Sequence, residues 1–223
     1  MTHQRDGTMN AAESLCRLAA RHGFGAESEE TGRLLVYLAL LEKWNARINL
    51  TAATDWAAIG WLFEEALWAA GFCGRARLRQ LDIGSGAGFP AVPMKLVRPA
   101  MQLCLVESRA KRAAFLETVA AELRLEGMEV VCSRAEEYLR TSGEDRFDVI
   151  SWKALKLSHE AFTQLLDRCG PTTRFWLFHG PELPFKDPER ALRRLALVQR
   201  EQFPGYPNRK LSIYAVSRET SST

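Results

Sequence analysis

The stretch LDIGSGAGFPAVPMKL, residues 81–96, places three glycines within five positions, between an apolar run typical of a strand and one typical of a helix. From residue 76 onward, strand-like and helix-like segments alternate, which predicts a mostly parallel, doubly wound α/β sheet of Rossmann-like type. In such sheets a ligand binds beyond the carboxyl ends of the strands, where the first turn leads into the first helix. Gly84, Gly86 and Gly88 would let the backbone turn sharply and approach that ligand closely.

The segments around this turn divide the chain into two parts. The first seventy residues are expected to be helical over 10–23, 27–45 and 54–70, because apolar residues recur there at helical spacing. Further along, we expect strands within 78–84, 101–108, 128–132, 146–155 and 173–180, a turn after the third strand, and helices within 89–99, 109–125, 157–170 and 188–197. Residues 198–204 and 210–218 are expected to form a closing antiparallel hairpin. These predictions give an N-terminal helical extension, 1–74, and an α/β domain, 75–219, in one compact unit.

Composition narrows the class of protein further. The 223 residues, 47% hydrophobic and 26% charged, are typical of a globular chain. The polar start MTHQRDGTMN, and the lack of any apolar run of about eighteen residues, predict neither a signal peptide nor a membrane span. Five cysteines without a C-x-x-C pair, most of them in apolar runs, indicate buried free thiols in a reducing cytoplasm. Four histidines without paired spacing indicate that no metal is bound.

The net charge is only +3, but basic residues gather in two segments. Residues 75–112 hold eight Lys or Arg against two acids, and residues 186–210 hold seven against three. Such segregation suits a polyanionic partner that contacts both basic segments. It suits solvated helix faces equally well, so charge alone does not decide whether the chain binds nucleic acid.

The residues after the glycines indicate what the turn binds. A nicotinamide-binding fingerprint, G-x-G-x-x-G, would place glycine at position 89, where this chain has Phe89 followed by Pro90. The observed pattern is acid-x-G-x-G-x-G, with Asp82 as the acid. Because phosphate groups prefer an unobstructed helix N-terminus, the bulky Phe-Pro step favours a ligand without phosphate at this point. No G-x-x-x-x-G-K-[ST] motif occurs, which excludes a P-loop.

Acidic residues also follow the next two expected strands. Glu107 ends the second strand, nineteen residues after Gly88, where a carboxylate can accept both ribose hydroxyls of an adenosine. After the third strand, Ala135 and Glu136 stand where an adenine edge could meet a backbone amide and a carboxylate. Each acid alone could be an ordinary surface residue, and the glycines alone could serve a tight turn. Their combination at these spacings predicts S-adenosylmethionine as the ligand, with Asp82 and the three glycines beside it.

Four segments of the chain resemble a known family. KWNARINLTAATD, LDIGSGAGFPAVPMKL, VESRAKRAAFLE and SRAEE are similar to segments of the bacterial glucose-inhibited division protein B family, whose members are small-subunit ribosomal RNA guanine-N7 methyltransferases. The likeness covers about residues 30–150 in recognisable motifs. It implies that Gly84, Phe89, Ala135 and Glu136 surround the methyl donor and that Glu107 binds its ribose. It also implies a cytoplasmic methyltransferase of ribosomal RNA or of the ribosomal subunit, which we expect to act as a monomer.

Three positions depart from the family pattern, all on the side expected to face the acceptor. Trp61 and Leu62 stand where the family has an Arg-His pair, Ser151-Trp152-Lys153 replaces Ser-Arg-Ala, and His179-Gly180 replaces Lys-Gly. Lys153 or His179 could supply the missing positive charge, or the acceptor site could have been rebuilt for another substrate. Trp152 could stack on a purine or close the site as apolar filler.

The motifs that are missing help to define the reaction. No cysteine stands in the context that methylation of cytosine C5 requires, no Asn/Asp-Pro-Pro-aromatic turn follows the fourth strand, and no set of carboxylates suits metal-assisted transfer. Guanine N7 carries a free lone pair and needs no general base, so alignment of the two substrates could supply most of the catalysis. The sequence assigns no catalytic residue outright, and Lys153, His179 and Trp152 are the candidates.

Basic residues offer candidate contacts to RNA phosphates. They are Arg109, Lys111 and Arg112 at the start of one helix, and Arg209 and Lys210 before the last strand. The first hypothesis is a methyltransferase for guanine N7 in small-subunit ribosomal RNA. The alternatives are a diverged relative that acts on another RNA or a small molecule, and a non-catalytic module that binds RNA or a nucleotide.

Overall fold

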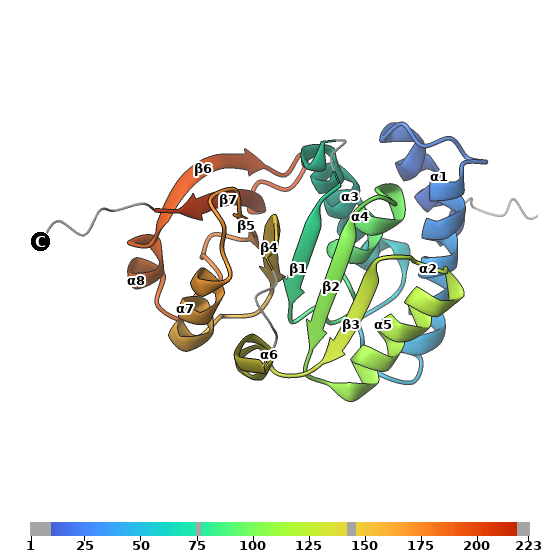
Figure 1. The fold of residues 1–223 in the computed structure, drawn as a ribbon. Helices are drawn as coiled ribbons and strands as arrows, with labels where there is room; N and C mark the ends of the chain where they lie inside the picture. Colours follow the sequence, from blue (N-terminus) through green and yellow to red (C-terminus); the bar gives the residue numbers. More distant parts are fainter. Residues whose placement is uncertain (1–9, 75–76, 142–145, 218–223) are drawn as a thin grey trace, which may run out of the picture.

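The computed structural model describes residues 10–74, 77–141 and 146–217, and at its centre is a seven-stranded sheet (Figure 1). The strands are β1 (Arg79–Ile83), β2 (Gln102–Glu107), β3 (Met128–Cys132), β4 (Val149–Lys153), β5 (Arg174–His179), β6 (Leu195–Gln202) and β7 (Lys210–Val216). Their order in the sheet is β3-β2-β1-β4-β5-β7-β6. The first five pair in parallel, and β7 runs antiparallel to β5 and β6. The predicted Rossmann-like α/β fold with a closing antiparallel hairpin is confirmed.

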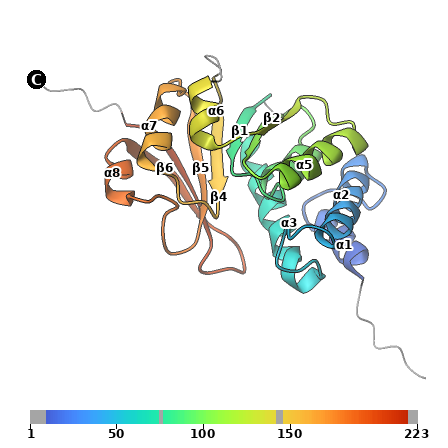
Figure 2. The ribbon, with the colours of Figure 1, turned by 90° about the horizontal axis from the view of Figure 1, so that it is seen from below.

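Helices cover both faces of this sheet. They are α1 (Ala11–Arg21), α2 (Glu29–Asn45), α3 (Trp56–Ala70), the 3-10 turn η1 (Gly71–Cys73), α4 (Ala91–Val97), α5 (Ala110–Glu122), α6 (Ala135–Thr141), α7 (His159–Asp167) and α8 (Pro188–Leu192). The chain runs outward from β1 to β3 and then returns to β4 on the other side of β1. Right-handed crossovers therefore put α4 and α5 on one face and α6 and α7 on the other. Figure 2 shows α6, α7 and α8 grouped apart from α1, α2, α3 and α5.

Alternating side chains on the strands fill a separate core on each face. On β2, Leu103 and Leu105 pack with buried side chains of α1 to α5, whereas Cys104 and Val106 pack with those of α6 to α8. We refer to these as the α3 face and the α7 face. Because successive side chains of a strand point to opposite faces, a residue's place along its strand decides which face it reaches.

Polar residues start the three N-terminal helices. Asn10, Ser28 and Asp55 cap α1, α2 and α3, and each side chain accepts a hydrogen bond from the backbone N–H three residues further on. Such a cap satisfies a backbone donor that the first turn of a helix leaves free, and it is worth about 1 kcal/mol. The caps explain why helix formation starts at these residues, as the sequence pattern predicted.

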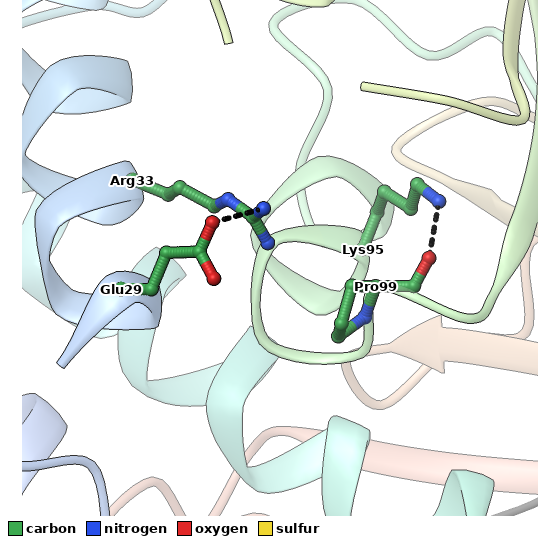
Figure 3. A network of polar contacts seen from close by, with 4 residues as sticks. All are labelled: Glu29, Arg33, Lys95 and Pro99. Carbon is green, nitrogen blue, oxygen red and sulfur yellow. Dashed lines mark hydrogen bonds and ion pairs between the residues drawn. The ribbon is translucent and has the colours of Figure 1, made fainter. Parts of the chain in front are cut away.

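Polar contacts also fix α2 and the end of α4 (Figure 3). Glu29 and Arg33 form an ion pair of 2.6 Å, one turn apart on α2. The buried Lys95 ammonium donates hydrogen bonds to the carbonyl oxygens of Pro99, at 2.7 Å, and Met101, at 2.5 Å. Lys95 thereby holds the loop that leads from α4 into β2, the strand that ends at the predicted ribose-binding acid.

Aromatic rings join the N-terminal helices to the glycine turn. The Phe63 ring on α3 lies edge-on to Phe89, with ring centres 5.0 Å apart, and the Tyr37 ring on α2 lies 5.5 Å from the same ring. Phe115 on α5 lies 6.2 Å from Tyr37. Edge-on aromatic pairs add to the stabilisation that burial gives, so the helices preceding the sheet support the turn directly.

Several details differ from the sequence predictions. Residues 135–141 form helix α6 rather than a turn, because Tyr138 and Leu139 pack into the core of the α7 face. The helix expected over 188–197 ends at Leu192, since residues from Leu195 onward pair with β7 as strand β6. The cysteines are free, but only Cys73 and Cys104 are buried. None of the helices in the described part of the chain is long and apolar enough to cross a membrane.

Candidate functional site

The glycine turn has a backbone that other residues adopt poorly. Gly84 has φ +72° and Gly88 has φ +90°, both in the left-handed region. A Cβ atom on Gly88 would lie 2.6 Å from Val92 Cγ2, so this glycine allows α4 to begin directly against the turn. Gly84 and Gly86 instead border a cavity. The three glycines thus have two roles, close packing of the helix and exposure of bare backbone to the cavity.

This cavity has a volume of about 560 Å³ and lies at the carboxyl ends of β1, β2 and β4. Its walls include six of the predicted donor-binding residues, namely Gly84, Gly86, Phe89, Glu107, Ala135 and Glu136. Other lining residues are Thr51, Leu62, Arg134, Lys153, Leu155, Ser158 and Lys186. We refer to it as the donor cavity. The structure therefore brings together predicted donor-binding residues that lie up to 52 positions apart in the sequence, from Gly84 to Glu136.

Glu107 is held in one orientation at the wall of the donor cavity. Its Oε2 accepts a 2.8 Å hydrogen bond from the Gly86 N–H, and its Oε1 accepts one of 2.8 Å from the Arg109 N–H. The residue is only 4% exposed. Each carboxylate oxygen can accept more than one hydrogen bond, so both oxygens retain capacity toward a ligand in the cavity.

Glu136 is tied to the helix on the other side of the cavity. The Ser158 hydroxyl donates a 2.9 Å hydrogen bond to Glu136 Oε1, and it also caps α7 by accepting from the Ala161 N–H. Ala135 and Glu136 begin α6, so their backbone and side chains border the cavity together. The third-strand acid is thereby positioned from two helices.

Asp82 lies beneath the turn and does not line the donor cavity. Its Oδ1 accepts a 2.6 Å hydrogen bond from the Ser151 hydroxyl, which in turn accepts one of 2.8 Å from the Gln80 amide. Burial raises the Asp82 pKa to about 6, against hydrogen bonds from Ser151 and Ser85 that lower it. Direct contact with the donor was expected, but the structure makes Asp82 a link between β1 and β4 under the turn.

Two of the three catalytic candidates face away from the cavity. The Trp152 side chain is fully buried on the α7 face, and its indole N–H donates to the Pro184 carbonyl at 2.8 Å. Of the two roles considered for this indole, stacking on a base and apolar filling, its position shows the second. His179 lies between the Gly180 carbonyl and the Ser212 hydroxyl, at 2.7 and 2.9 Å, and burial lowers its pKa. Strand alternation explains both placements, because Trp152 and His179 point to the face opposite α3.

Lys153 is the catalytic candidate that lines the donor cavity. Its ammonium donates to Glu65 Oε2 on α3 and lies 4.5 Å from the centre of the Trp61 ring. The sequence analysis missed Glu65, although the adjacent acids Glu64 and Glu65 within the otherwise apolar helix WAAIGWLFEEALWAA were a visible signal. Within the described residues, no group of three or more His, Cys, Asp or Glu side chains could hold a metal ion.

The candidate RNA contacts fall into two places. A second cavity, of about 460 Å³, is lined by Arg47, Ile48, Asn49, Arg109, Ala110, Lys111 and Arg112. Arg109 and Arg112 line the donor cavity as well. We refer to this second cavity as the basic cavity, because four of its residues are cationic and none is acidic. Arg209 instead lies over the Trp61 ring at 4.1 Å, and Lys210 pairs with His179 across β5 and β7.

A family model and two relatives of similar sequence carry the same description. The family model described as rRNA small subunit methyltransferase G matches residues 30–196. A ribosomal RNA small subunit methyltransferase G of Roseiflexus castenholzii is 37% identical over 145 residues, which are 64% of this chain and 62% of the relative. One from Nitrosospira multiformis is 40% identical over 136 residues, 60% of this chain and 62% of the relative. The chain thus spans less than two thirds of the length of these curated relatives.

Solved structures share the fold at low sequence identity. A mutant of MtNAS in complex with S-adenosylmethionine superposes with a TM-score of 0.56 at 14% identity, covering 94% of this chain and 99% of that one. The ribosomal protein L11 methylase of Lactobacillus delbrueckii subsp. bulgaricus gives a TM-score of 0.52 at 12% identity, covering 70% and 79%. At these identities the likeness concerns the fold alone. The family match extends over most of the chain, from the α2 helix into β6, and the protein belongs to the rRNA small subunit methyltransferase G family, the glucose-inhibited division protein B family that its motifs resemble.

Proposed function

We propose that this protein is an S-adenosylmethionine-dependent methyltransferase that modifies N7 of a guanine in small-subunit ribosomal RNA. The family supports this proposal. The observation that carries it is the Glu107 carboxylate, which two backbone N–H groups fix at the wall of a cavity bordered by bare glycine backbone. We also propose that the enzyme is cytoplasmic and acts as a monomer.

The donor cavity fits S-adenosylmethionine in size and chemistry. Its volume of about 560 Å³ lies within the usual range for small-molecule sites. Glu107 would bind the ribose hydroxyls, and Ala135 and Glu136 would border the adenine. The Gly84 and Gly86 backbone leaves room for the methionine part of the donor, and Phe89 gives an apolar wall. No phosphate-binding group is needed in this arrangement.

Methylation of guanine N7 requires no acid–base chemistry from the protein. When bound, the donor supplies a methyl group from its sulfonium: the carbon–sulfur bond breaks as the N7 lone pair forms the carbon–nitrogen bond, and the positive charge passes to the purine. Because N7 loses no proton, the chain needs no general base, and its role is to align acceptor and donor. This fits a cavity in which Trp152 and His179 are turned away and Lys153 remains.

The basic cavity supports RNA as the substrate. It lies beside the donor cavity, with Arg109 and Arg112 common to both. None of Arg47, Arg109, Lys111 and Arg112 forms an ion pair with an acid among the described residues, so their charges remain available to phosphates. Contacts of this kind would hold an RNA strand in register without reading its sequence.

Methyl transfer to isolated ribosomal subunits tests the proposal. Small subunits from a strain that lacks this modification are incubated with the protein and labelled donor, and the RNA is digested for mass spectrometry of its nucleosides. We expect label in 7-methylguanosine. Label in another nucleoside would assign the site to a different acceptor, and donor binding without transfer to any RNA would favour a small-molecule substrate or a non-catalytic binding module.

A further inference from the structure

A group of four side chains closes the end of β4 on the α3 face. Trp61 and Glu65 are one turn apart on α3 and share a side of that helix. Lys153 ends β4 and Arg209 immediately precedes β7. The Lys153 ammonium binds Glu65 Oε2 and lies 4.5 Å from the Trp61 ring centre, while the Arg209 guanidinium lies 4.1 Å from the same centre. We refer to these four residues as the acceptor-side cluster.

The ion pair between Glu65 and Lys153 joins α3 to β4 at a large desolvation cost. The Glu65 side chain is 2% exposed and that of Lys153 is 12% exposed. Removing two charges from water costs several kcal/mol per ion, which their attraction offsets only in part, so a pair of apolar side chains would hold the two elements at least as well. A buried pair whose lysine also lines the donor cavity is therefore better explained by what that lysine presents to the ligand.

The sheet places Lys153 at the opposite end of the cavity from the ribose acid. Glu107 ends β2, Gly84 follows β1, and Lys153 ends β4, and these three strands are neighbours in the order β2-β1-β4. With the ribose on Glu107, and the adenine toward Ala135 and Glu136, the methyl-bearing end of the donor extends across β1 toward β4. The acceptor must approach that end, where Lys153 lies.

We propose that the Lys153 ammonium donates a hydrogen bond to the carbonyl oxygen of the acceptor guanine, beside N7, and that Glu65 is the positioning residue that holds it there. This inference rests on the proposed function. An ammonium has three donors, of which Glu65 takes one. The carbonyl oxygen and N7 are adjacent acceptors on the same edge of guanine, so a donor on the oxygen leaves the N7 lone pair free to attack.

Glu65 has a second role in this arrangement, because the purine becomes positively charged as the methyl group arrives. An isolated ammonium next to that ring would oppose the reaction, and the effect is strong where water is excluded. The carboxylate of Glu65 offsets the charge of Lys153. The pair can thus bind the carbonyl oxygen with less resistance to transfer than lysine alone would offer.

The same contacts give the pair a signature in pH dependence. Burial lowers the Lys153 pKa, and the Glu65 carboxylate on α3 is the main group that raises it. Arg209, before β7, lowers the Lys153 pKa further, and Asp82 on β1 raises it. Replacing Glu65 by glutamine removes the main group that keeps Lys153 protonated. The alkaline limb of the rate profile should then move to lower pH.

The test compares methyl transfer to small-subunit RNA by the wild type, Glu65→Gln, Glu65→Asp and Lys153→Met, with the donor dissociation constant measured for each. Glu64→Gln is the matched control, because Glu64 immediately precedes Glu65 on α3 and pairs with Arg21 at 3.1 Å instead. We expect Glu65→Gln and Lys153→Met to lower kcat/KM for RNA by about tenfold or more, with donor affinity changed less than about twofold. Glu65→Asp should restore part of the activity, and Glu64→Gln should match the wild type.

Several results would overturn this inference. One is a kcat/KM and a pH profile of Glu65→Gln that are unchanged from the wild type. Another is a donor affinity that falls in parallel with activity in the Glu65 and Lys153 variants. If single variants fail to fold, the double variant Glu65→Gln/Lys153→Met removes both buried charges, and wild-type activity in that protein would also contradict the inference. A wild type that places no methyl group on guanine N7 would instead contradict the proposed function, so the two failures are distinguishable.

Discussion

The Tyr37 hydroxyl on α2 donates a 2.5 Å hydrogen bond to the Ala87 carbonyl oxygen, in the middle of the glycine turn. Tyr37 is fully buried, and burial raises its pKa well above the ordinary value, so the hydroxyl keeps its proton. The residues are 50 positions apart. An N-terminal helix therefore orients the backbone that borders the donor cavity, and the helical extension contributes to the site as well as to the core.

Replacing Tyr37 by phenylalanine tests this connection. The variant keeps the ring packing but leaves the buried Ala87 carbonyl without its partner, which should lower the free energy of unfolding by about 1–2 kcal/mol. Donor affinity should also fall, because the turn is no longer held. Urea unfolding and calorimetric donor titration measure the two effects. Tyr206→Phe is the control, since the Tyr206 hydroxyl forms no hydrogen bond within the described part of the chain; equal behaviour of the two variants would contradict the role of Tyr37.

Asp82 should make the stability of the protein depend on pH. Its pKa is about 6 in the folded protein, above the ordinary value of 3.8, because burial disfavours the charged carboxylate. The folded state therefore binds the proton more tightly than the unfolded state. The stabilisation that Asp82 gives the folded state is fully present below pH 3.8. It is lost as the pH rises to about 6, and the total loss is about 2–3 kcal/mol.

The variant Asp82→Asn isolates that contribution. Asparagine keeps an oxygen that can accept from Ser151 but cannot ionise. Urea midpoints measured between pH 4 and pH 7 should show the wild type losing stability relative to Asp82→Asn as pH rises. A difference between the two proteins that is constant over this range would show that Asp82 titrates normally.

Contacts in the basic cavity should appear in the salt dependence of RNA binding. Lys111 and Arg47 line this cavity and are exposed. Each substitution, Lys111→Gln or Arg47→Gln, should weaken binding and reduce the slope of log affinity against log salt by about 0.7–0.9. Donor affinity should stay the same. Lys43→Gln is the control, because Lys43 is exposed on α2 outside the cavity; a loss equal to that of Lys111→Gln would indicate nonspecific charge attraction.

Features encoded by local patterns were predictable from the sequence. The strand, turn and helix around Gly84 needed only apolar runs and glycines, and Glu107 followed from its place at the end of the next strand. The burial of Trp152 could have been deduced as well. It alternates with Ser151 and Lys153 along β4 and shares a face with Ile150, so a tryptophan there packs against the helices of the α7 face.

Features that depend on the packing of distant segments could not be predicted in this way. Glu65 meets Lys153 across 88 positions, and no local pattern fixes how α3 lies against β4. Tyr37 reaches Ala87 through the same packing. Packing also changes the local structure of residues 135–141. Their short polar sequence resembles a turn, but it is helical because Tyr138 and Leu139 pack into the core of the α7 face. Tertiary burial decides such segments.

The most direct test of the central claim is calorimetric titration of S-adenosylmethionine into the wild type, Glu107→Ala and the control Glu117→Ala, whose exposed acid lies on α5. Glu107 accepts the Gly86 and Arg109 N–H groups and is proposed to bind the ribose. We expect the wild type and Glu117→Ala to bind equally and Glu107→Ala to bind more weakly by about 2–4 kcal/mol. Equal affinity in all three proteins, or no binding by the wild type, would contradict the donor site.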